Sequence, residues 1–231
     1  MNNPIQIYNE PDIGRLFVVG DIHGCYDLLM AELAKVSFDF QRDWLISVGD
    51  LVDRGAQCVQ CVALLKQPWF KPVRGNHEQM CIDGFSDIHY AELHFKDSNG
   101  GRWFYQLPRE QRAEIVSQFE NLPIIIEVTF KNKKYGFVHA QVDARNDWEL
   151  FKQGVAMSED YLGRSIADGA IWGRERARAP LHASGFASVA HVDEVYLGHT
   201  VMPQAIQKHN CFFIDTGAYM TGVLTVRELG V

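Results

Sequence analysis

The chain has little positive charge and no long hydrophobic run. Its 231 residues include 22 Lys and Arg against 29 Asp and Glu, a formal net charge of −7. This balance excludes a broad basic surface for nucleic acid or an anionic membrane. The apolar residues 124–126 stop at Glu127, whereas a membrane span needs about 20 apolar residues. The N-terminal residues 1–10 are polar, so we expect no signal peptide and a cytoplasmic protein.

Cysteines and linker-like sequence are also scarce. Five cysteines are an odd number in a chain of this size, which favours free thiols in a reducing compartment over a disulfide framework. Cys58 and Cys61 have the spacing of half a zinc or redox motif, but no second pair accompanies them. We therefore expect both to pack on the apolar face of a helix. No repeat or Pro/Gly/Ser-rich linker divides the chain, which predicts a single domain over residues 1–231.

The signatures of several common enzyme sites are absent as well. The chain contains no P-loop, no G-x-G-x-x-G dinucleotide loop, no G-x-S-x-G elbow and no H-E-x-x-H metal motif. Hydrophobic residues make up 47% of the chain, so it is a globular protein rather than a disordered one. Any chemistry must therefore come from a different set of residues.

What the chain does contain is a repeated local pattern. Short apolar runs of strand length, rich in Val, Ile and Phe, end abruptly at polar residues able to bind metal or phosphate. Because ligands collect beyond the carboxyl ends of strands in open α/β sheets, we expect these ends to converge on one site. The runs are 16–19, 44–48, 72–73, 135–138, 195–197 and 212–214.

The sequence between the apolar runs predicts an α/β fold. Residues 26–36 and 58–65 repeat apolar side chains at helical spacing, and strands that are apolar throughout predict a sheet covered on both faces. Residues 83–121 keep a helical or mixed period, and we interpret them as a helical insert whose last helix starts at Pro108.

Two hairpins are predicted in the second half of the chain. The polar turn 131–133 predicts that residues 124–130 pair with 134–138, and residues 212–214 are expected to pair with 223–226. Together these hairpins predict a second, mixed sheet.

Six residues at the strand ends form a mixed set of oxygen and imidazole donors. Each one alone is more often a turn, cap or core residue. A strand end does not in general require a ligand side chain, so the six together indicate a metal site. The donor set suits Mn²⁺, Fe²⁺ or Zn²⁺, and Asp50 is the natural carboxylate to bridge two ions. The six residues are Asp21, His23, Asp50, Asn76, His139 and His199.

Three longer blocks carry a family resemblance. Residues 20–24 (GDIHG), 49–55 (GDLVDRG) and 74–78 (RGNHE) resemble the signature motifs of the phosphoprotein phosphatase branch of the calcineurin-like metallophosphoesterases. The compact length is most similar to that of the bacterial and bacteriophage serine/threonine phosphatases of the lambda type. The resemblance implies one catalytic domain: a central β-sandwich of mixed sheets flanked by helices, with a dinuclear metal site at the carboxyl ends of the strands. Residues 137–140, 197–200 and 214–218 match the family's later motifs.

The resemblance also implies how the metal site is built. Asp21, His23 and Asp50 would hold one divalent ion, and Asp50, Asn76, His139 and His199 would hold the other, with Asp50 bridging. We expect Mn²⁺, with Fe²⁺ and Zn²⁺ also compatible. A hydroxide between the two ions would attack phosphorus directly, without a phosphoenzyme.

Catalytic and substrate-binding roles follow from the same resemblance. His77 would protonate the leaving group as a general acid, and Asp53 would orient His77. Arg54, Arg74 and Arg174 would bind phosphate oxygens through their guanidinium groups.

The sequence leaves three assignments undecided: the third arginine, the role of Glu78 and the turn at Gln141. Arg176 and Arg178 lie close enough in sequence to take the place assigned to the third arginine. Glu78 either starts the helix after the third motif or orients an arginine. Gln141 stands where the family commonly has Gly, which leaves the turn behind His139 undefined.

The expected activity is hydrolysis of phosphoserine and phosphothreonine, with phosphotyrosine and phosphohistidine as further candidates. The partners would be phosphorylated proteins or peptides, not nucleic acid or membrane, and the oligomeric state is open, a monomer being compatible. A rival enzyme is a symmetrical diadenosine tetraphosphate hydrolase, a group that typically carries Ala at the position of Asp53 and Asp at that of Glu78. A rival of another class is an inactive phosphoprotein-binding module, although all six ligands and His77 are present.

Overall fold

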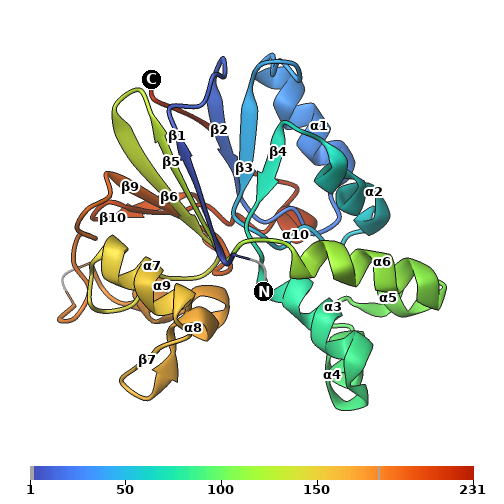
Figure 1. The fold of residues 1–231 in the computed structure, drawn as a ribbon. Coiled ribbons are helices and arrows are strands. Elements are labelled where there is room, and N and C mark those ends of the chain that lie inside the picture. The colour runs from blue at the N-terminus through green and yellow to red at the C-terminus, as the bar shows by residue number, and fades with distance from the viewer. Residues whose placement is uncertain (1–2, 182) are drawn as a thin grey trace.

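Two β-sheets lie face to face at the centre of the molecule, with helices outside them (Figure 1). The computed structural model describes residues 3–181 and 183–231. The smaller sheet has the order β12 (Val226–Leu229), β2 (Leu16–Val19), β3 (Trp44–Ser47) and β4 (Phe70–Pro72). The larger has the order β1 (Ile5–Asn9), β5 (Ile125–Phe130), β6 (Lys133–Val138), β9 (Glu194–Leu197), β11 (Cys211–Phe213) and β10 (Ile206–Lys208). Both sheets mix parallel and antiparallel pairs, which confirms the predicted fold class.

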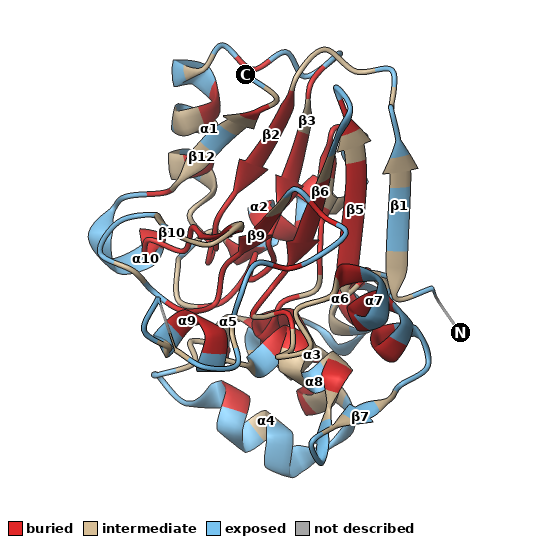
Figure 2. Cartoon of the chain, turned by 90° about the vertical axis from the view of Figure 1, so that its left-hand side faces the viewer, coloured by how far each residue is buried: buried red, intermediate tan, exposed pale blue. Residues whose placement is uncertain are grey.

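The alternation of side chains along each strand explains why two sheets pack together. In β2, Leu16 and Val18 join the core between the sheets, which also contains Ile126 of β5. Phe17 and Val19 point the other way, into the core beneath the outer helices. A strand that buries both faces needs apolar side chains at every position. The continuous apolar runs of the sequence are therefore the central strands, which Figure 2 shows buried along their length.

Helices cover the outer face of each sheet. On the smaller sheet, α1 (Tyr26–Lys35) buries Leu29 and Leu33, and α2 (Cys58–Ala63) lies beside it. On the larger sheet, α7 (Trp148–Ala156) buries Trp148 and Phe151. The remaining elements are η1 (Leu64–Lys66), α3 (Asn76–Ser86), α4 (Ile88–Phe95), α5 (Arg102–Gln106), α6 (Arg109–Glu120), β7 (Asp160–Tyr161), β8 (Arg164–Ser165), α8 (Ile166–Trp172), α9 (Glu175–Arg178) and α10 (Ala218–Thr221).

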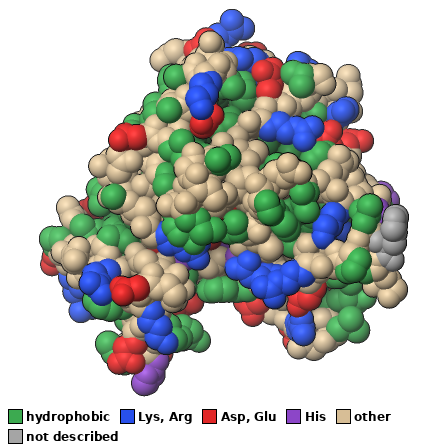
Figure 3. Space-filling view, turned by 180° about the vertical axis from the view of Figure 1, so that it is seen from behind, with side chains coloured by type: hydrophobic (Ala, Val, Ile, Leu, Met, Phe, Trp, Pro, Cys, Tyr) green, Lys and Arg blue, Asp and Glu red, His purple; other side chains and the backbone are tan. Residues whose placement is uncertain are grey.

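Two lobes project from the same end of the sandwich. One contains α3 to α6, and the other contains α8 and the β7–β8 hairpin (Figure 1). Seen from behind, a notch separates the lobes, and Lys and Arg side chains lie along its upper margin (Figure 3). Pro108 is the N-cap of α6, as the sequence predicted. The helices begin at Asn76, earlier than residue 83, because α3 follows directly on the third motif.

One predicted hairpin is confirmed and the other is wrong. Strands β5 and β6 pair antiparallel across the turn at residues 131–132. Strand β11 instead pairs with β9 and β10, and β12 pairs with β2 of the other sheet. The segment between them contains α10 rather than a tight turn, so the chain crosses from one sheet to the other.

Two further expectations can be compared with the structure. Among the described residues, no helix combines the length and the apolar character needed to cross a bilayer. All five cysteines are free thiols, and Cys58 and Cys61 pack in the core beneath α1 as predicted.

A buried ion pair offers a test of the packing on the larger sheet. Lys152 Nζ lies 2.6 Å from Glu127 Oε2, and Glu127 is 4% exposed. Lys152→Met should lower the free energy of unfolding by about 3 kcal/mol, because it leaves a buried carboxylate without its main partner. Urea denaturation measures the loss. Lys133→Met is the matched control, since that lysine side chain is 52% exposed in its ion pair and should contribute about 1 kcal/mol or less; equal losses would contradict the prediction.

Candidate active site

Loops that follow strands of both sheets bring the six predicted ligand residues to one edge of the sandwich. Each of the six is at most 6% exposed, so the cluster is buried. Asp21 and His23 follow β2, Asp50 follows β3, Asn76 begins α3 after β4, His139 follows β6, and His199 follows β9.

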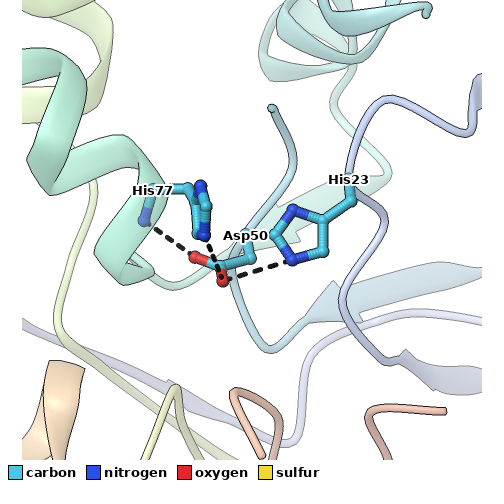
Figure 4. Close-up of side chains that lie close together, drawn as sticks. All are labelled: His23, Asp50 and His77. Carbon is cyan, nitrogen blue, oxygen red and sulfur yellow. Dashed lines mark hydrogen bonds and ion pairs between the residues drawn. The ribbon is translucent and has the colours of Figure 1, made fainter. Parts of the chain in front are cut away.

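Asp50 lies between His23 and His77 (Figure 4). Its Oδ2 is 3.5 Å from Nε2 of His23 and 3.9 Å from Nε2 of His77, whose backbone N–H donates to Oδ1 at 2.9 Å. His139 Nε2 lies 3.4 Å from Oδ1. Asp50 therefore belongs to two groups of potential ligand atoms, one with His23 and His77 and one with His139 and His199. A carboxylate shared in this way can bridge two cations.

Backbone carbonyls determine which nitrogen of two imidazoles faces the cluster. His23 Nδ1 lies 2.9 Å from the carbonyl oxygen of Val52, and His139 Nδ1 lies 2.8 Å from that of Val48. A carbonyl only accepts, so each ring proton is on Nδ1. Nε2 of both rings then carries the lone pair and faces Asp50, which makes it the potential metal-ligand atom.

The other donors complete the set in different ways. His199 Nε2 donates to the carbonyl of Trp172 at 3.1 Å, so its Nδ1 is the potential ligand atom. Asn76 Oδ1 lies 3.0 Å from His139 Nε2, which brings an amide oxygen and an imidazole nitrogen to the same point. The carboxylate of Asp21 accepts from the backbone N–H of His199 at 3.0 Å.

Burial sets the charges of these groups. It lowers the pKa of His23 to about 3 and that of His199 to about 2, which keeps both rings neutral, the form that binds a metal. Burial, together with the carboxylates of Asp215 and Asp50, raises the pKa of Asp21 well above its usual range. At Asp50 burial acts in the same direction, but the neighbouring imidazoles outweigh it and lower the pKa. Crowded carboxylates and the neutral imidazoles of His23 and His199 fit two divalent cations, which would balance this charge.

A second pair lies beside the ligand cluster. His77 Nδ1 and Asp53 Oδ2 are 2.6 Å apart, and both side chains are buried. Burial alone would raise the pKa of Asp53, but hydrogen bonds from His77 and His94 outweigh it and lower the pKa to about 2. Asp53 is thus an ionised acceptor that holds the His77 proton on Nδ1 and directs Nε2 toward Asp50.

Two of the predicted phosphate-binding arginines lie at the cluster. Arg54 Nη1 donates to His23 Nε2 at 2.5 Å, and its guanidinium carbon lies 4.8 Å from the centre of the Tyr219 ring. Arg174 Nη1 donates to the carbonyl of His199 at 2.8 Å. Both guanidinium groups are therefore held next to proposed metal ligands.

The other arginines are engaged elsewhere. Arg74 donates to the side chain of Gln79 and to the carbonyls of Glu120, the last residue of α6, and of Leu122 just beyond it. Arg176 is 2% exposed and donates to the carbonyl of Val142 and to other buried acceptors. The structure therefore places Arg174, and not Arg176, beside the ligand loops.

Glu78 connects the second and third motifs. Its carboxylate accepts backbone N–H groups from Gly75 at 2.8 Å, Asp50 at 2.9 Å and Leu51 at 2.8 Å. The contact with Gly75 caps α3, so of the two roles that the sequence left open for Glu78 the structure shows the start of this helix. The contacts with Asp50 and Leu51 also hold the loop that carries the central carboxylate.

Gln141 lines a cavity next to the cluster. Its side chain lies against Gly173, where an added Cβ would be 2.3 Å from Gln141 Cδ. The turn behind His139 is held by the backbone N–H of Ala140, which donates to the carbonyl of Ala170 at 2.7 Å. The cavity has a volume of about 780 Å³ and is also lined by Trp172, the residue whose carbonyl orients His199.

Sequence reasoning missed several residues around the site. The ring of Tyr219 lies 5.3 Å from that of His23, and Asp215 is 1% exposed and close enough to affect the charge of Asp21. His94 and Trp103 contact Asp53. Asp215 ends an apolar run, a signal that could have found it, whereas the others lie in no pattern that marks a site.

Comparison with known proteins agrees with this geometry. The sequence pattern of the family described as calcineurin-like phosphoesterase matches residues 14–203. The chain belongs to the calcineurin-like phosphoesterases. Members of this family are hydrolases of phosphate esters, and membership implies divalent metal ions, for which the clusters around Asp50 are suited.

This phosphoesterase resembles proteins with two different names. It is 34% identical over 236 residues to serine/threonine-protein phosphatase 1 of Salmonella typhimurium, covering 99% of the chain and 100% of the relative. It is 30% identical over 136 residues to the symmetrical bis(5'-nucleosyl)-tetraphosphatase of Actinobacillus pleuropneumoniae, covering 58% of the chain and 47% of the relative. A protein serine/threonine phosphatase structure from Saccharomyces cerevisiae has the same fold, with a TM-score of 0.62 at 16% identity over 94% of this chain and 73% of that one.

The contacts of Glu78 predict its effect on metal binding by the phosphoesterase. Glu78→Gln replaces an acceptor-only carboxylate with an amide that cannot accept from all three backbone donors. Mn²⁺ affinity, measured by isothermal titration calorimetry on chelator-treated protein, should fall about 10- to 100-fold. Glu92→Gln, on the exposed surface of α4, is the control and should bind Mn²⁺ like the unchanged protein. Unaltered affinity in Glu78→Gln would show that the loop holds Asp50 without it.

Proposed function

We propose that this phosphoesterase is a protein phosphatase that hydrolyses phosphoserine and phosphothreonine. The observation that carries the choice is the 2.6 Å contact between His77 and Asp53. A serine or threonine alkoxide is a poor leaving group and needs a proton as the bond to phosphorus breaks. Cleavage of a dinucleotide tetraphosphate releases a nucleotide phosphate, which leaves readily without one. An oriented general acid is therefore most useful to an enzyme that acts on protein phosphomonoesters.

The remaining residues have complementary roles in this proposal. When bound, two divalent ions, with Mn²⁺ expected, supply Lewis-acid charge to the phosphate oxygens and lower the pKa of a water nucleophile. Arg54 and Arg174 would bind phosphate oxygens at the edge of the cluster. Arg74 is a third phosphate contact in the proposal. To reach the phosphate, its guanidinium would have to leave the backbone carbonyls that it contacts at the end of α6. The ligands would be Asp21, His23 and Asp50 for one ion and Asp50, Asn76, His139 and His199 for the other.

The surroundings of the site support a polypeptide substrate. The notch between the two lobes (Figure 3) is open at its lower edge, so a chain could extend on both sides of a bound phosphate. The cavity beside it is lined by Leu162, Trp172 and Phe186, and could receive an apolar side chain next to the phosphorylated residue. The near full-length similarity to a protein phosphatase points the same way.

A symmetrical dinucleotide tetraphosphatase is the second candidate. Relatives with that name match the chain at 30% identity, although over 58% of its length. Residues Asp53 and Glu78 count against it, since that group typically carries Ala and Asp at these positions. Both candidates share the metal cluster, so only the substrate separates them.

A direct comparison of substrates tests the proposal. The Mn²⁺-loaded protein should hydrolyse a phosphoserine or phosphothreonine peptide with a higher kcat/KM than diadenosine tetraphosphate. Phosphate release and chromatography of the nucleotides measure the two reactions. Chelation should abolish turnover and Mn²⁺ should restore it. Faster turnover of the dinucleotide would select the second candidate, and no metal-restored hydrolysis of either substrate would favour an inactive phosphoprotein-binding module.

The role of His77 predicts a dependence on the leaving group. His77→Asn should lower kcat for phenyl phosphate about 100-fold or more, in line with the loss of a general acid. For 2,4-dinitrophenyl phosphate, whose phenolate leaves without a proton, the loss should be about ten-fold smaller. His89→Asn, on the exposed face of α4, is the matched control. Equal losses for both esters would remove His77 from the acid role.

A further inference from the structure

Helices α4 and α5 carry two side chains that reach the catalytic pair. We infer that His94 and Trp103 are positioning residues, which hold the Asp53 carboxylate against His77 and so direct His77 toward the leaving group. The inference rests on the general-acid role in the proposed function and deepens it. It assigns α4 and α5 a part in the chemistry, beyond forming one wall of the notch.

The contacts at Asp53 show how its orientation is fixed. Oδ2 accepts from His77 Nδ1 at 2.6 Å and from His94 Nε2 at 2.8 Å, while Oδ1 accepts from Trp103 Nε1 at 2.6 Å. Asp53 is fully buried, so no solvent competes for these oxygens. Donors on both oxygens prevent the carboxylate from rotating about its last bond. If either donor from the lobe is lost, the carboxylate can turn away from His77.

The protons along this chain of contacts follow from its acceptors. An ionised Asp53 only accepts, so His94 carries its proton on Nε2. His94 Nδ1, 3.1 Å from the hydroxyl of Tyr105, then accepts from that hydroxyl. Burial raises the pKa of the nearby Cys81 thiol well above its usual range, so no second negative charge competes for His94. Every donor in the chain has an acceptor, and the chain ends at His77.

Two glycines show that the backbone is shaped around this chain. An added Cβ at Gly101 would lie 2.2 Å from His94 Cδ2, and one at Gly84 would lie 2.2 Å from the hydroxyl of Tyr105. Neither position can carry a side chain unless the imidazole or the hydroxyl moves. The backbone is therefore packed tightly around His94 and Tyr105.

The backbone around Asp53 explains why outside donors are needed. Asp53 and Arg54 have φ angles of 70° and 67°, in the left-handed region that non-glycine residues rarely adopt. Such a conformation is stabilised only when the surroundings hold it. Asp53 also donates its backbone N–H to Cys58 Sγ at 3.2 Å, a weak contact. The strong contacts to this residue come from His77 of α3, His94 of α4 and Trp103 of α5.

Leaving-group dependence tests the inference with aryl phosphates, so its outcome does not depend on which natural substrate is correct. His94→Phe and Trp103→Phe should each lower kcat about ten-fold for phenyl phosphate and about two-fold or less for 2,4-dinitrophenyl phosphate, with little change in KM, because they weaken the general acid alone. His94→Gln keeps an N–H at the position of Nε2 and should recover most of the lost selectivity. Trp69→Phe makes the same substitution as Trp103→Phe in the same core. It should leave the ratio of kcat for phenyl phosphate to kcat for 2,4-dinitrophenyl phosphate unchanged.

Two further measurements separate positioning from a general loss of structure. In a His77→Asn background, His94→Phe should cause no additional change in leaving-group selectivity, since the two residues act through one proton. In an ¹H–¹⁵N spectrum, the Trp103 indole N–H signal, identified by its loss in Trp103→Phe, should shift in His94→Phe and stay in place in Trp69→Phe.

The outcomes that overturn the inference are distinct from those that overturn the function. Two results would show that His94 and Trp103 contribute only to packing. One is an equal fold-loss of kcat for both esters in folded variants, and the other is additive effects with His77→Asn. If His94→Phe does not fold, by circular dichroism, Trp103→Phe and His94→Gln decide the result. A protein that hydrolyses aryl phosphates with the expected selectivity but prefers the dinucleotide to the phosphopeptide would refute the proposed substrate and support the positioning role.

Discussion

The buried carboxylate of Asp50 is the constraint on which the site depends. It is 2% exposed and faces Nε2 atoms of His23, His77 and His139 within 3.9 Å. The loop that carries it also orients two of these rings, since the carbonyls of Val48 and Val52, two residues to either side, accept their Nδ1 protons. One short segment after β3 therefore supplies the shared carboxylate and sets the direction of ligands that come from both sheets. A change in this loop would displace the ligands together.

The sandwich supports a strained site. His23, Asp50, Asp53, Arg54 and His199 all have positive φ angles, between 44° and 70°, and each such conformation costs on the order of 1–3 kcal/mol. The strands that precede these loops are buried on both faces, and the burial of their apolar side chains offsets this strain. In these strained conformations the loops direct backbone and side-chain donor groups toward the cluster, whereas relaxed turns would direct them elsewhere. Part of the stability of the core therefore offsets the strain in the loops that hold the proposed ligand side chains together.

How much the sequence predicts depends on how far apart the interacting residues lie. That the six proposed ligand residues lie together could be predicted, because each stands in a short block at the end of an apolar run and the strand order brings the blocks together. The roles of His94 and Trp103 could not be predicted, because their partner Asp53 is 41 and 50 residues away in the sequence and no motif beside them marks a site. The pairing of β12 was wrong for a similar reason: its partner β2 lies near the other end of the chain, while β11 offered a nearer one.

The excess of acidic residues is compatible with phosphate chemistry because of where the acids lie. Asp21, Asp50, Asp53 and Asp215 are each at most 2% exposed, and at the ligand cluster two divalent cations would reverse the local sign. The chain as a whole carries a formal net charge of −7, and this acidic balance disfavours the binding of extended polyanions. Attraction for phosphate would then be confined to the cluster, because charges farther than about 8–10 Å are screened at physiological salt. In the proposed function, such a site would select a single phosphate brought into the notch, a requirement that a flexible phosphorylated segment meets better than a long anionic polymer does.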